Sequence, residues 1–247
     1  MIDSFDIEVP ASVLVIAAHP DDAEFHAGAT LAKWSRMGTE VSHLVLTDGS
    51  KGTWDPDADQ AELVERRKEE QQCAAAALGA NGEVVFLNAV DGELDASLSL
   101  RGQVAEVIRQ IRPTVILGHD PWKRYRLHPD HHAAGQLCID GVVAARDPFF
   151  YREQLNAGIE PHRPEALLLF EPDEANHAEI VLEADHQRRI AALEAHQSQV
   201  ETTHFYKLST DDPLEGFRQR EREQLEKSGA EVGQPMAELY RLIVDQL

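Results

Sequence analysis

The chain has 247 residues, and its 43% hydrophobic content is enough to form the core of one large domain or two small ones. It carries 44 acidic and 23 basic residues, a formal net charge of −21 with neutral histidines. This negative charge argues against broad electrostatic attachment to nucleic acid or to an anionic membrane. The composition favours a soluble globular protein.

Neither targeting segments nor cysteine chemistry is expected from the sequence. The N-terminal segment MIDSFDIEVP has no basic stretch before an apolar run, and no run of about 18 apolar residues occurs. We therefore expect a cytoplasmic location and no membrane partner. Cys73 and Cys138 lie in stretches of helical pattern, so we expect buried thiols and neither a disulfide nor a cysteine metal site.

Short apolar runs alternate with longer segments of helical period through the first part of the chain. The predicted strands cover residues 13–18, 41–47, 84–87, 114–120 and 166–170. The predicted helices cover residues 23–37, 65–79, about 98–112 and about 131–146. Gly79 is predicted to end the second helix, and Pro113 follows the third. This alternation predicts a doubly wound α/β fold, with a mainly parallel sheet covered by helices on both faces.

Beyond residue 180 the pattern becomes helical and charged. We predict helices over residues 184–199, 213–229 and 236–246, packed so that 1–247 forms a single domain. The segment RQREREQLEK at 218–227 predicts an exposed helix with ion pairs between residues four apart. An oligomer contact at this helix is the less favoured alternative.

The run AHPDD at 18–22 directly follows the first predicted strand. In an open α/β sheet, the loops beyond the carboxyl ends of the strands form the binding crevice. His19 and Asp22 are three residues apart on a turn with Pro20, so their side chains can converge on one metal ion and leave Asp21 free beside it. In the alternative interpretation, Asp21 or Asp22 only caps the next helix.

A second motif of the same kind, HPDHH at 128–132, follows a later strand and opens the next helix. Two such turns after parallel strands can face one crevice. A catalytic zinc commonly has three nitrogen and oxygen ligands from the protein, and His19, Asp22 and His131 meet this count. His132 is the alternative third ligand, although on a helix it projects away from His131.

The segments AHPDDAEFHAGATLAKW at 18–34 and HPDHHAAG at 128–135 closely resemble the two signatures of the PIG-L/LmbE-like deacetylases. Weaker similarities extend the resemblance over about residues 13 to 199. The resemblance implies a Rossmann-like fold and metal-dependent removal of an acetyl group from an N-acetylated amino sugar, usually an N-acetylglucosaminyl conjugate. It implies zinc as the cofactor, with ferrous iron as the alternative. The resemblance does not decide whether the chain forms a homo-oligomer.

The resemblance also implies roles for individual residues. It assigns zinc binding to three of them, namely His19, Asp22 and His131. Asp21 is then the general base, and His128 stabilises the oxyanion, preferably as an imidazolium. Asp130 is implied to lie beside His128 and orient it, while Arg67 and Asp91 are implied to contact sugar hydroxyls or the aglycone.

The chain departs from the family pattern at three positions of the first signature. Ala23 replaces a common acidic residue, and His26 and Ala29 replace the usual glycines. His26 adds the most bulk, so we expect a different pocket size and unchanged metal ligands.

The main basic cluster of this acidic chain runs from Lys123 to Arg126, immediately before the second motif. A solvated loop is the simpler interpretation. The alternative is a rim that contacts a phosphate or carboxylate of the aglycone, with Trp122 or Tyr125 stacked on a sugar ring. His119, at a strand end, is a further residue that could line the crevice.

The leading hypothesis is a zinc-dependent N-deacetylase that acts on a small amino-sugar conjugate. One alternative is an amidase that uses the same metal residues on a larger acyl group or a thiol conjugate. Another is a non-catalytic α/β ligand-binding module. A dinucleotide-dependent oxidoreductase is disfavoured, because HPDD and not G-x-G-x-x-G follows the first strand.

Overall fold

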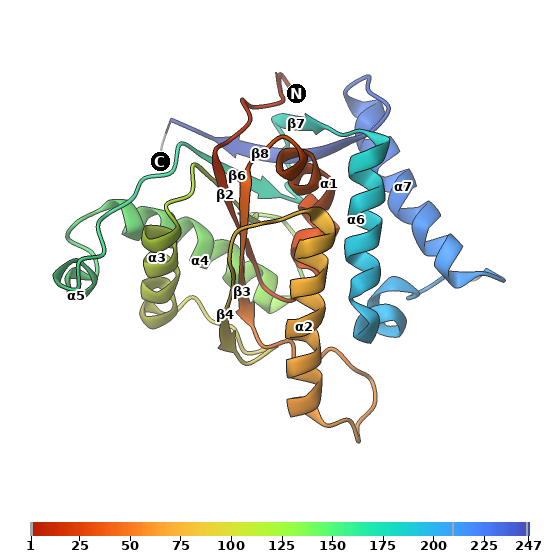
Figure 1. Cartoon of the computed structure of the whole chain (residues 1–247), viewed down its shortest axis with the longest axis horizontal. Coiled ribbons are helices and arrows are strands. Elements are labelled where there is room, and N and C mark those ends of the chain that lie inside the picture. The colour runs from red at the N-terminus through yellow and green to blue at the C-terminus, as the bar shows by residue number, and fades with distance from the viewer. Residues whose placement is uncertain (1, 209, 246) are drawn as a thin grey trace.

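The computed structural model describes residues 2–208, 210–245 and 247, and one mixed sheet runs through this part of the chain (Figure 1). The order of its strands is β1-β7-β8-β6-β5-β2-β3-β4. The strands are β1 (Ser4–Phe5), β2 (Ser12–Ala17), β3 (Glu40–Thr47), β4 (Val84–Ala89), β5 (Val115–His119), β6 (Ala166–Phe170), β7 (His177–Ile180) and β8 (Ala237–Ile243). Among the strands of the described residues, only β8 runs antiparallel to its neighbours, β6 and β7.

Helices cover both faces of the sheet. They are α1 (Asp22–Arg36), α2 (Gln60–Leu78), α3 (Leu98–Ile111), α4 (Pro129–Arg146), α5 (Arg152–Asn156), α6 (Glu183–Ala195) and α7 (Pro213–Glu231). In Figure 1, α1, α2, α6 and α7 lie on one side of the sheet, and α3 and α4 lie on the other. The predicted α/β fold with a mainly parallel sheet is confirmed.

Strand β2 lies at the centre of the core and is buried on both faces. Val13 and Val15 belong to the hydrophobic cluster under α1 and α2, whereas Leu14 and Ile16 belong to the cluster under α3 and α4. Successive side chains of a strand point to opposite faces, so a strand covered on both sides needs apolar residues at every position. This explains the unbroken apolar run that predicted the strand.

The pairing of β2 with β5 positions the two histidine motifs. These strands are adjacent and parallel, with Val13 opposite Val115. Their carboxyl ends therefore lie at the same edge of the sheet, where β2 leads into 18–22 and β5 leads through 120–128 into α4. The expected common crevice follows from this pairing.

The C-terminal segment corrects the prediction of a helix over 236–246, because residues Ala237–Ile243 form β8. The spacing of its apolar residues fits a helix as well as a strand. The segment forms a strand because it pairs with β6 on one side and with β7 on the other. Strands β1 and β7 were not predicted, since each has only a few residues.

The two cysteines lie on helices, as predicted, but only one is buried. Cys138 on α4 has no exposed surface, and burial raises the pKa of its thiol to about 12. Cys73 on α2 is exposed, which corrects the expectation of a second buried thiol.

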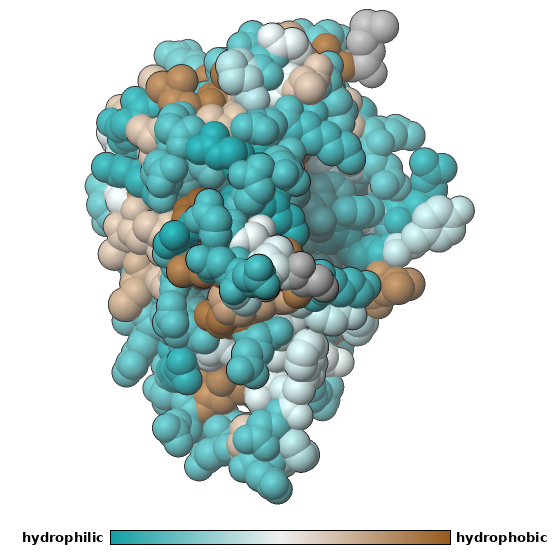
Figure 2. All heavy atoms as spheres, turned by 90° about the vertical axis from the view of Figure 1, so that its right-hand side faces the viewer, coloured by the Kyte–Doolittle hydropathy of each residue, from teal (hydrophilic) through white to brown (hydrophobic). Residues whose placement is uncertain are grey.

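The side of the molecule that carries α6 and α7 is mostly hydrophilic, with scattered hydrophobic residues (Figure 2). Helix α7 has the expected pair of Arg222 with Glu226, 3.7 Å apart. Glu221 of the same helix is nevertheless buried and lies 2.8 Å from Arg189 of α6, so α7 also packs through a buried ion pair. Among the described residues, no helix is both long and apolar enough to cross a bilayer.

Candidate metal centre and its pocket

The turn between β2 and α1 holds the first motif in an unusual backbone conformation. Asp21 has a φ of 103°, in the left-handed region that non-glycine residues seldom adopt, and its N–H donates to Gln71 Oε1 at 3.0 Å. The side chain of Asp21, the N-cap residue, makes no capping hydrogen bond within the part of the chain that the structure describes, and Asp22 Oδ2 accepts the N–H of His19 at 2.8 Å. These contacts favour a functional turn over the interpretation that Asp21 or Asp22 only caps the helix.

The structure brings His19, Asp22 and His131 together. Each offers one ligand atom, and these atoms all lie within 4.8 Å of one another. His131 Nε2 is 3.2 Å from Asp22 Oδ1, and His19 Nδ1 is 3.3 Å from Asp22 Oδ2. Burial would raise the pKa of Asp22, but the neighbouring His131 and His119 hold it well below its usual range. Two imidazoles and one ionised carboxylate suit a divalent metal such as zinc.

The ring of His19 is oriented by two other carboxylates. Its Nε2 lies 3.0 Å from Asp130 Oδ2 and 3.2 Å from Asp91 Oδ1. A carboxylate accepts an N–H in a hydrogen bond, so Nε2 keeps its hydrogen, and Nδ1, beside Asp22, is the nitrogen that gives up its proton to bind a metal ion. Burial lowers the pKa of His19, but the contacts with Asp130, Asp22 and Asp91 outweigh it and raise the pKa well above its usual value.

Two further groups among the described residues can in principle hold a metal. One combines His19 with Asp91 and His128, and the other consists of His26, His119 and Glu171. The first would use His19 Nε2, which already faces the carboxylates of Asp130 and Asp91. The orientation of His19 therefore favours the group with Asp22 and His131.

Asp130 is placed differently from the role implied for it. Its carboxylate is fully buried and accepts the N–H groups of Gly92 and Leu94 at 2.6 and 3.2 Å. The side chain that it contacts is His19, and no hydrogen bond joins it to His128 among those described. Asp130 thus orients a metal-ligand candidate, not the proposed oxyanion donor.

Asp21 lies at the pocket wall beside this group. Burial raises the pKa of its carboxyl group, Arg67 opposes the rise and the nearby Asp22 adds to it. Arg67 Nη2 is 3.5 Å from Asp21 Oδ2 and donates to Pro20 O at 2.7 Å. Since Arg67 is only 3% exposed, it holds the turn as well as facing the pocket.

His128 stands at the rim of the same group. Its ring centroid is 4.7 Å from that of His19 and 4.6 Å from that of His131. Partial burial and the two neighbouring imidazoles lower the pKa of His128. The neutral form is therefore the one to expect at neutral pH, in contrast to the expected imidazolium.

A pocket of about 650 Å³ opens over these residues and collects most of the predicted site. Its lining includes the predicted His19, Asp21, Asp22, Arg67, Asp91, His128 and His131. It also includes side chains that sequence reasoning missed, namely Phe25, Lys51, Glu171, Gln199, Thr203, Arg220, Glu221 and Gln224. Arg220 and Gln224 are four residues apart on α7, but only the packing of that helix places them here.

Comparison with known proteins assigns the family. The sequence model of the PIG-L family, described as GlcNAc-PI de-N-acetylase, matches residues 14–145. The diacetylchitobiose deacetylase of Thermococcus kodakarensis is 37% identical to this chain, and the match covers 76% of this chain and 69% of the relative. The chain belongs to the PIG-L family. The predicted family is thereby confirmed.

Other PIG-L relatives agree. The 1D-myo-inositol 2-acetamido-2-deoxy-alpha-D-glucopyranoside deacetylase of Streptomyces avermitilis is 30% identical, over 57% of this chain and 56% of the relative, so the match spans about half of that protein. The solved structure of N,N'-diacetylchitobiose deacetylase from Pyrococcus horikoshii, complexed with its inhibitor MPG, has 29% sequence identity and a TM-score of 0.84. It covers 95% of this chain and 84% of that one.

In the basic cluster of this PIG-L chain, residues 123–126, some side chains are exposed to solvent and one is buried. Tyr125 is 93% exposed, and Arg124 lies 3.3 Å from Asp173, as expected for a solvated loop. The side chain of Arg126, by contrast, is only 5% exposed. The expectation of a solvated loop is therefore wrong for Arg126.

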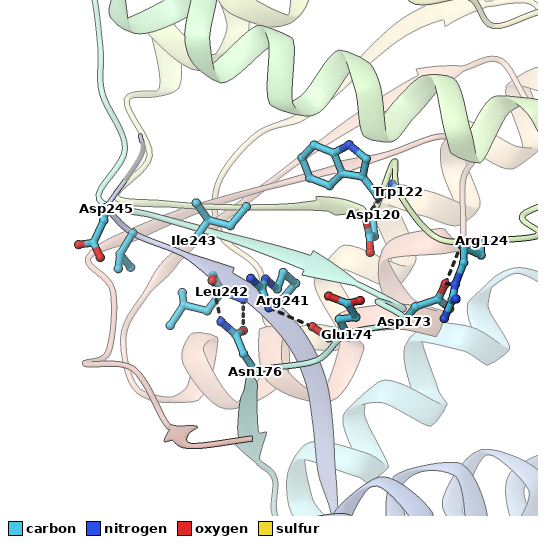
Figure 3. Close-up of a pocket in the computed structure, with 11 residues that line it drawn as sticks. Asp120, Trp122, Arg124, Asp173, Glu174, Asn176, Arg241, Leu242, Ile243 and Asp245 are labelled. Carbon is cyan, nitrogen blue, oxygen red and sulfur yellow. Dashed lines mark hydrogen bonds and ion pairs between the residues drawn. The ribbon is translucent and has the colours of Figure 1, made fainter. Parts of the chain in front are cut away.

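Trp122 lines a second cavity, of about 660 Å³, and not the metal pocket (Figure 3). Arg124 and Asp173 pair at one end of this cavity, and Asn176 is bonded to the backbone of Leu242 (Figure 3). None of the residues predicted to bind the metal, catalyse the reaction or contact the sugar hydroxyls is among the described residues that line it. A stacking role of Trp122 on a sugar in the metal pocket is thus not supported.

Proposed function

We propose that this PIG-L protein is a zinc-dependent N-deacetylase that removes an acetyl group from an N-acetylglucosaminyl-type conjugate. One observation carries the proposal: His19, Asp22 and His131 converge in a pocket that the carboxylate of Asp21 also lines. The named deacetylase relatives support the amino-sugar substrate class.

The metal ligands proposed are His19 through Nδ1, Asp22 and His131. A divalent ion held by them supplies Lewis acidity, which polarises a carbonyl oxygen and lowers the pKa of water. Asp130 and Asp91 hold the proton of His19 at Nε2 and so keep Nδ1 free to bind. Ferrous iron has the same ligand preferences and is the alternative metal.

Asp21 acts as the general base in this proposal. It takes a proton from the water molecule that attacks the acetyl carbonyl, and its raised pKa makes it a stronger base than an ordinary aspartate. The proton passes to the amine as the C–N bond breaks, so acetate and a free amino sugar are the products. Arg67, 3.5 Å away, keeps the carboxylate of Asp21 directed at the pocket.

His128 donates its N–H to the oxygen that becomes negative as water adds to the carbonyl. The lowered pKa of His128 means that a neutral imidazole makes this hydrogen bond. Asp91 and Arg67 line the pocket near His19 and are proposed to contact sugar hydroxyls. The backbone N–H of Lys51, which donates to Asp91 Oδ2 at 3.1 Å, holds the carboxylate of Asp91 in place.

The test is an amine-release assay on zinc-loaded and chelated protein. The panel contains N-acetylglucosamine, N,N'-diacetylchitobiose, an N-acetylglucosaminyl-inositol and their N-butyryl analogues. We expect amine and acetate from the acetyl compounds, abolished by chelation and in Asp21→Asn. Release only from the N-butyryl compounds would favour the wider amidase. No release from any compound, with zinc bound, would overturn the proposed function and favour a binding module.

A further inference from the structure

A partly buried polar cluster lies beside the metal-ligand candidates and has no part in the reaction described above. It consists of His26 on α1, His119 at the end of β5, Arg126 in the loop before α4, and Glu171 directly after β6. His119 has no exposed surface, and the side chain of Arg126 is 5% exposed. Four separate segments thus bring these side chains together next to Asp22.

Arg126 joins two members of this cluster. Its Nη1 lies 2.9 Å from His119 Nδ1, and its Nη2 lies 3.2 Å from Glu171 Oε2. A guanidinium has only donors, so His119 Nδ1 must be the acceptor. A neutral imidazole that accepts at one nitrogen carries its hydrogen on the other. His119 is therefore protonated at Nε2.

The protonated nitrogen of His119 faces a metal-ligand candidate. His119 Nε2 is 3.3 Å from Asp22 Oδ2 and donates its hydrogen to that oxygen. The N–H of Ala18 also points at Nε2, at 3.4 Å, which would require the opposite tautomer. The shorter contact with a permanently charged arginine decides in favour of hydrogen on Nε2.

This arrangement argues against a metal ion bound by His26, His119 and Glu171. Arg126 occupies His119 Nδ1, and His119 Nε2 carries a hydrogen. Glu171 is already shared between Arg126 and Lys123, whose Nζ lies 3.2 Å from Oε1. The positive charges of Arg126 and Lys123 already pair with the carboxylate of Glu171. The cluster therefore contacts the metal-ligand candidates through the hydrogen bond from His119 to Asp22.

The two oxygens of Asp22 have different surroundings as a result. Oδ2 accepts from the N–H of His19 at 2.8 Å and from His119 Nε2 at 3.3 Å. Oδ1 faces His131 Nε2 at 3.2 Å. Two donors on Oδ2 hold the plane of the carboxylate, and they leave Oδ1 directed toward His131.

We propose that Arg126 is a positioning residue for the metal centre, which fixes the tautomer of His119 so that His119 holds the carboxylate of Asp22. Arg126 touches neither the metal nor the substrate in this role. The inference rests on the proposed function only in taking Asp22 as a metal ligand. Partners that orient metal ligands typically change metal affinity by about 10- to 100-fold when they are removed.

The first test measures zinc affinity by competition with a chromogenic chelator, without any substrate. Arg126→Met is expected to bind zinc about 10- to 100-fold more weakly than the wild type. Arg124→Met is the matched control, because this neighbouring arginine is 74% exposed on its side chain and pairs with Asp173. Equal zinc affinity in Arg126→Met and the wild type, with both proteins folded by circular dichroism, would overturn the proposal.

The second test separates tautomer control from a general structural effect. The ¹⁵N shifts of the His119 ring are expected to report hydrogen on Nε2 in the wild type and a shift toward the Nδ1 form in Arg126→Met. In His119→Gln, the amide N–H of glutamine takes the place of the Nε2–H of His119, and glutamine has no tautomer for Arg126 to fix. Adding Arg126→Met to this variant is therefore expected to weaken zinc binding by less than about threefold. A full loss in that background would contradict the proposal.

These measurements stand apart from the deacetylase assay. Failure of the proposed function appears as zinc-loaded wild-type protein without amine release. Failure of the present inference appears as unchanged zinc affinity or an unchanged His119 tautomer in Arg126→Met, whatever the activity.

Discussion

Asp130 Oδ2 lies 3.0 Å from His19 Nε2 and also accepts the backbone N–H of Gly92, while Asp130 Oδ1 accepts the backbone N–H of Leu94. The carboxylate is fully buried, so its hydrogen bond to His19 is shielded from water. Asp130 therefore sets which nitrogen of His19 is free to bind a metal.

Replacing Asp130 with asparagine is expected to lower zinc affinity by about 10- to 100-fold, since an amide can present either a donor or an acceptor to His19. Asp140→Asn is the control on the same helix, because Asp140 bonds only to Gln136 among the side chains described. Competition with a chelator gives both affinities. Wild-type zinc binding by Asp130→Asn would show that His19 does not depend on this carboxylate.

Asp21→Asn is expected to retain zinc and lose catalysis. Asparagine cannot accept a proton from water, and loss of a general base typically costs about 10² to 10⁴ in rate. The measurement is kcat for amine release at saturating zinc, with metal content determined on the same samples. A variant that keeps more than about one tenth of wild-type kcat would exclude Asp21 as the base.

The metal-ligand candidates could be predicted because each lies in a short motif directly after a strand. His19 and Asp22 follow β2, His131 opens α4 after β5, and sequence order alone puts these turns at one sheet edge. Gly79 ends α2 in the left-handed conformation for an equally local reason.

The contacts between distant segments could not be predicted in this way. The partner of Asp130 depends on a distance across 111 residues, and Arg126 gives no local signal that its side chain turns inward. The helix predicted over 236–246 failed for a related reason. Its apolar residues suit two periods, and only the neighbouring strands decide that it is β8.

His26→Ala is expected to widen the pocket. The His26 ring stacks on Phe170 with centroids 5.1 Å apart, and it lines the pocket beside Asp22. Removing the ring leaves space for a larger acyl group, so kcat/KM for N-butyryl substrates is expected to rise relative to N-acetyl substrates. The expected rise is about 10-fold, which corresponds to about 1.4 kcal/mol of transition-state binding free energy. His132→Ala is the control, because His132 is exposed. An unchanged ratio would mean that His26 does not limit the acyl group.

Acid is expected to destabilise the metal-free protein through His119. Burial lowers the pKa of His119 to about 3, with Asp22 only partly opposing the effect, whereas the unfolded chain has a value of 6.5. Between these values the unfolded state binds a proton that the folded state does not. The stability that neutral His119 contributes is thus fully present above about pH 6.5 and is lost as pH falls toward about 3, at up to about 1.4 kcal/mol per pH unit.

Urea unfolding of chelated wild type and His119→Gln at pH 7, 6 and 5 measures this contribution, since glutamine does not titrate. His19 acts with the opposite sign, because its raised pKa favours the folded state at low pH, but it does so in both proteins. The difference between the two gives the contribution of His119 together with its effect on the pKa of Asp22. We expect the free energy of unfolding of the wild type to fall more steeply below about pH 6.5 than that of the variant. Parallel curves would mean that His119 takes up a proton in the folded state as readily as in the unfolded chain.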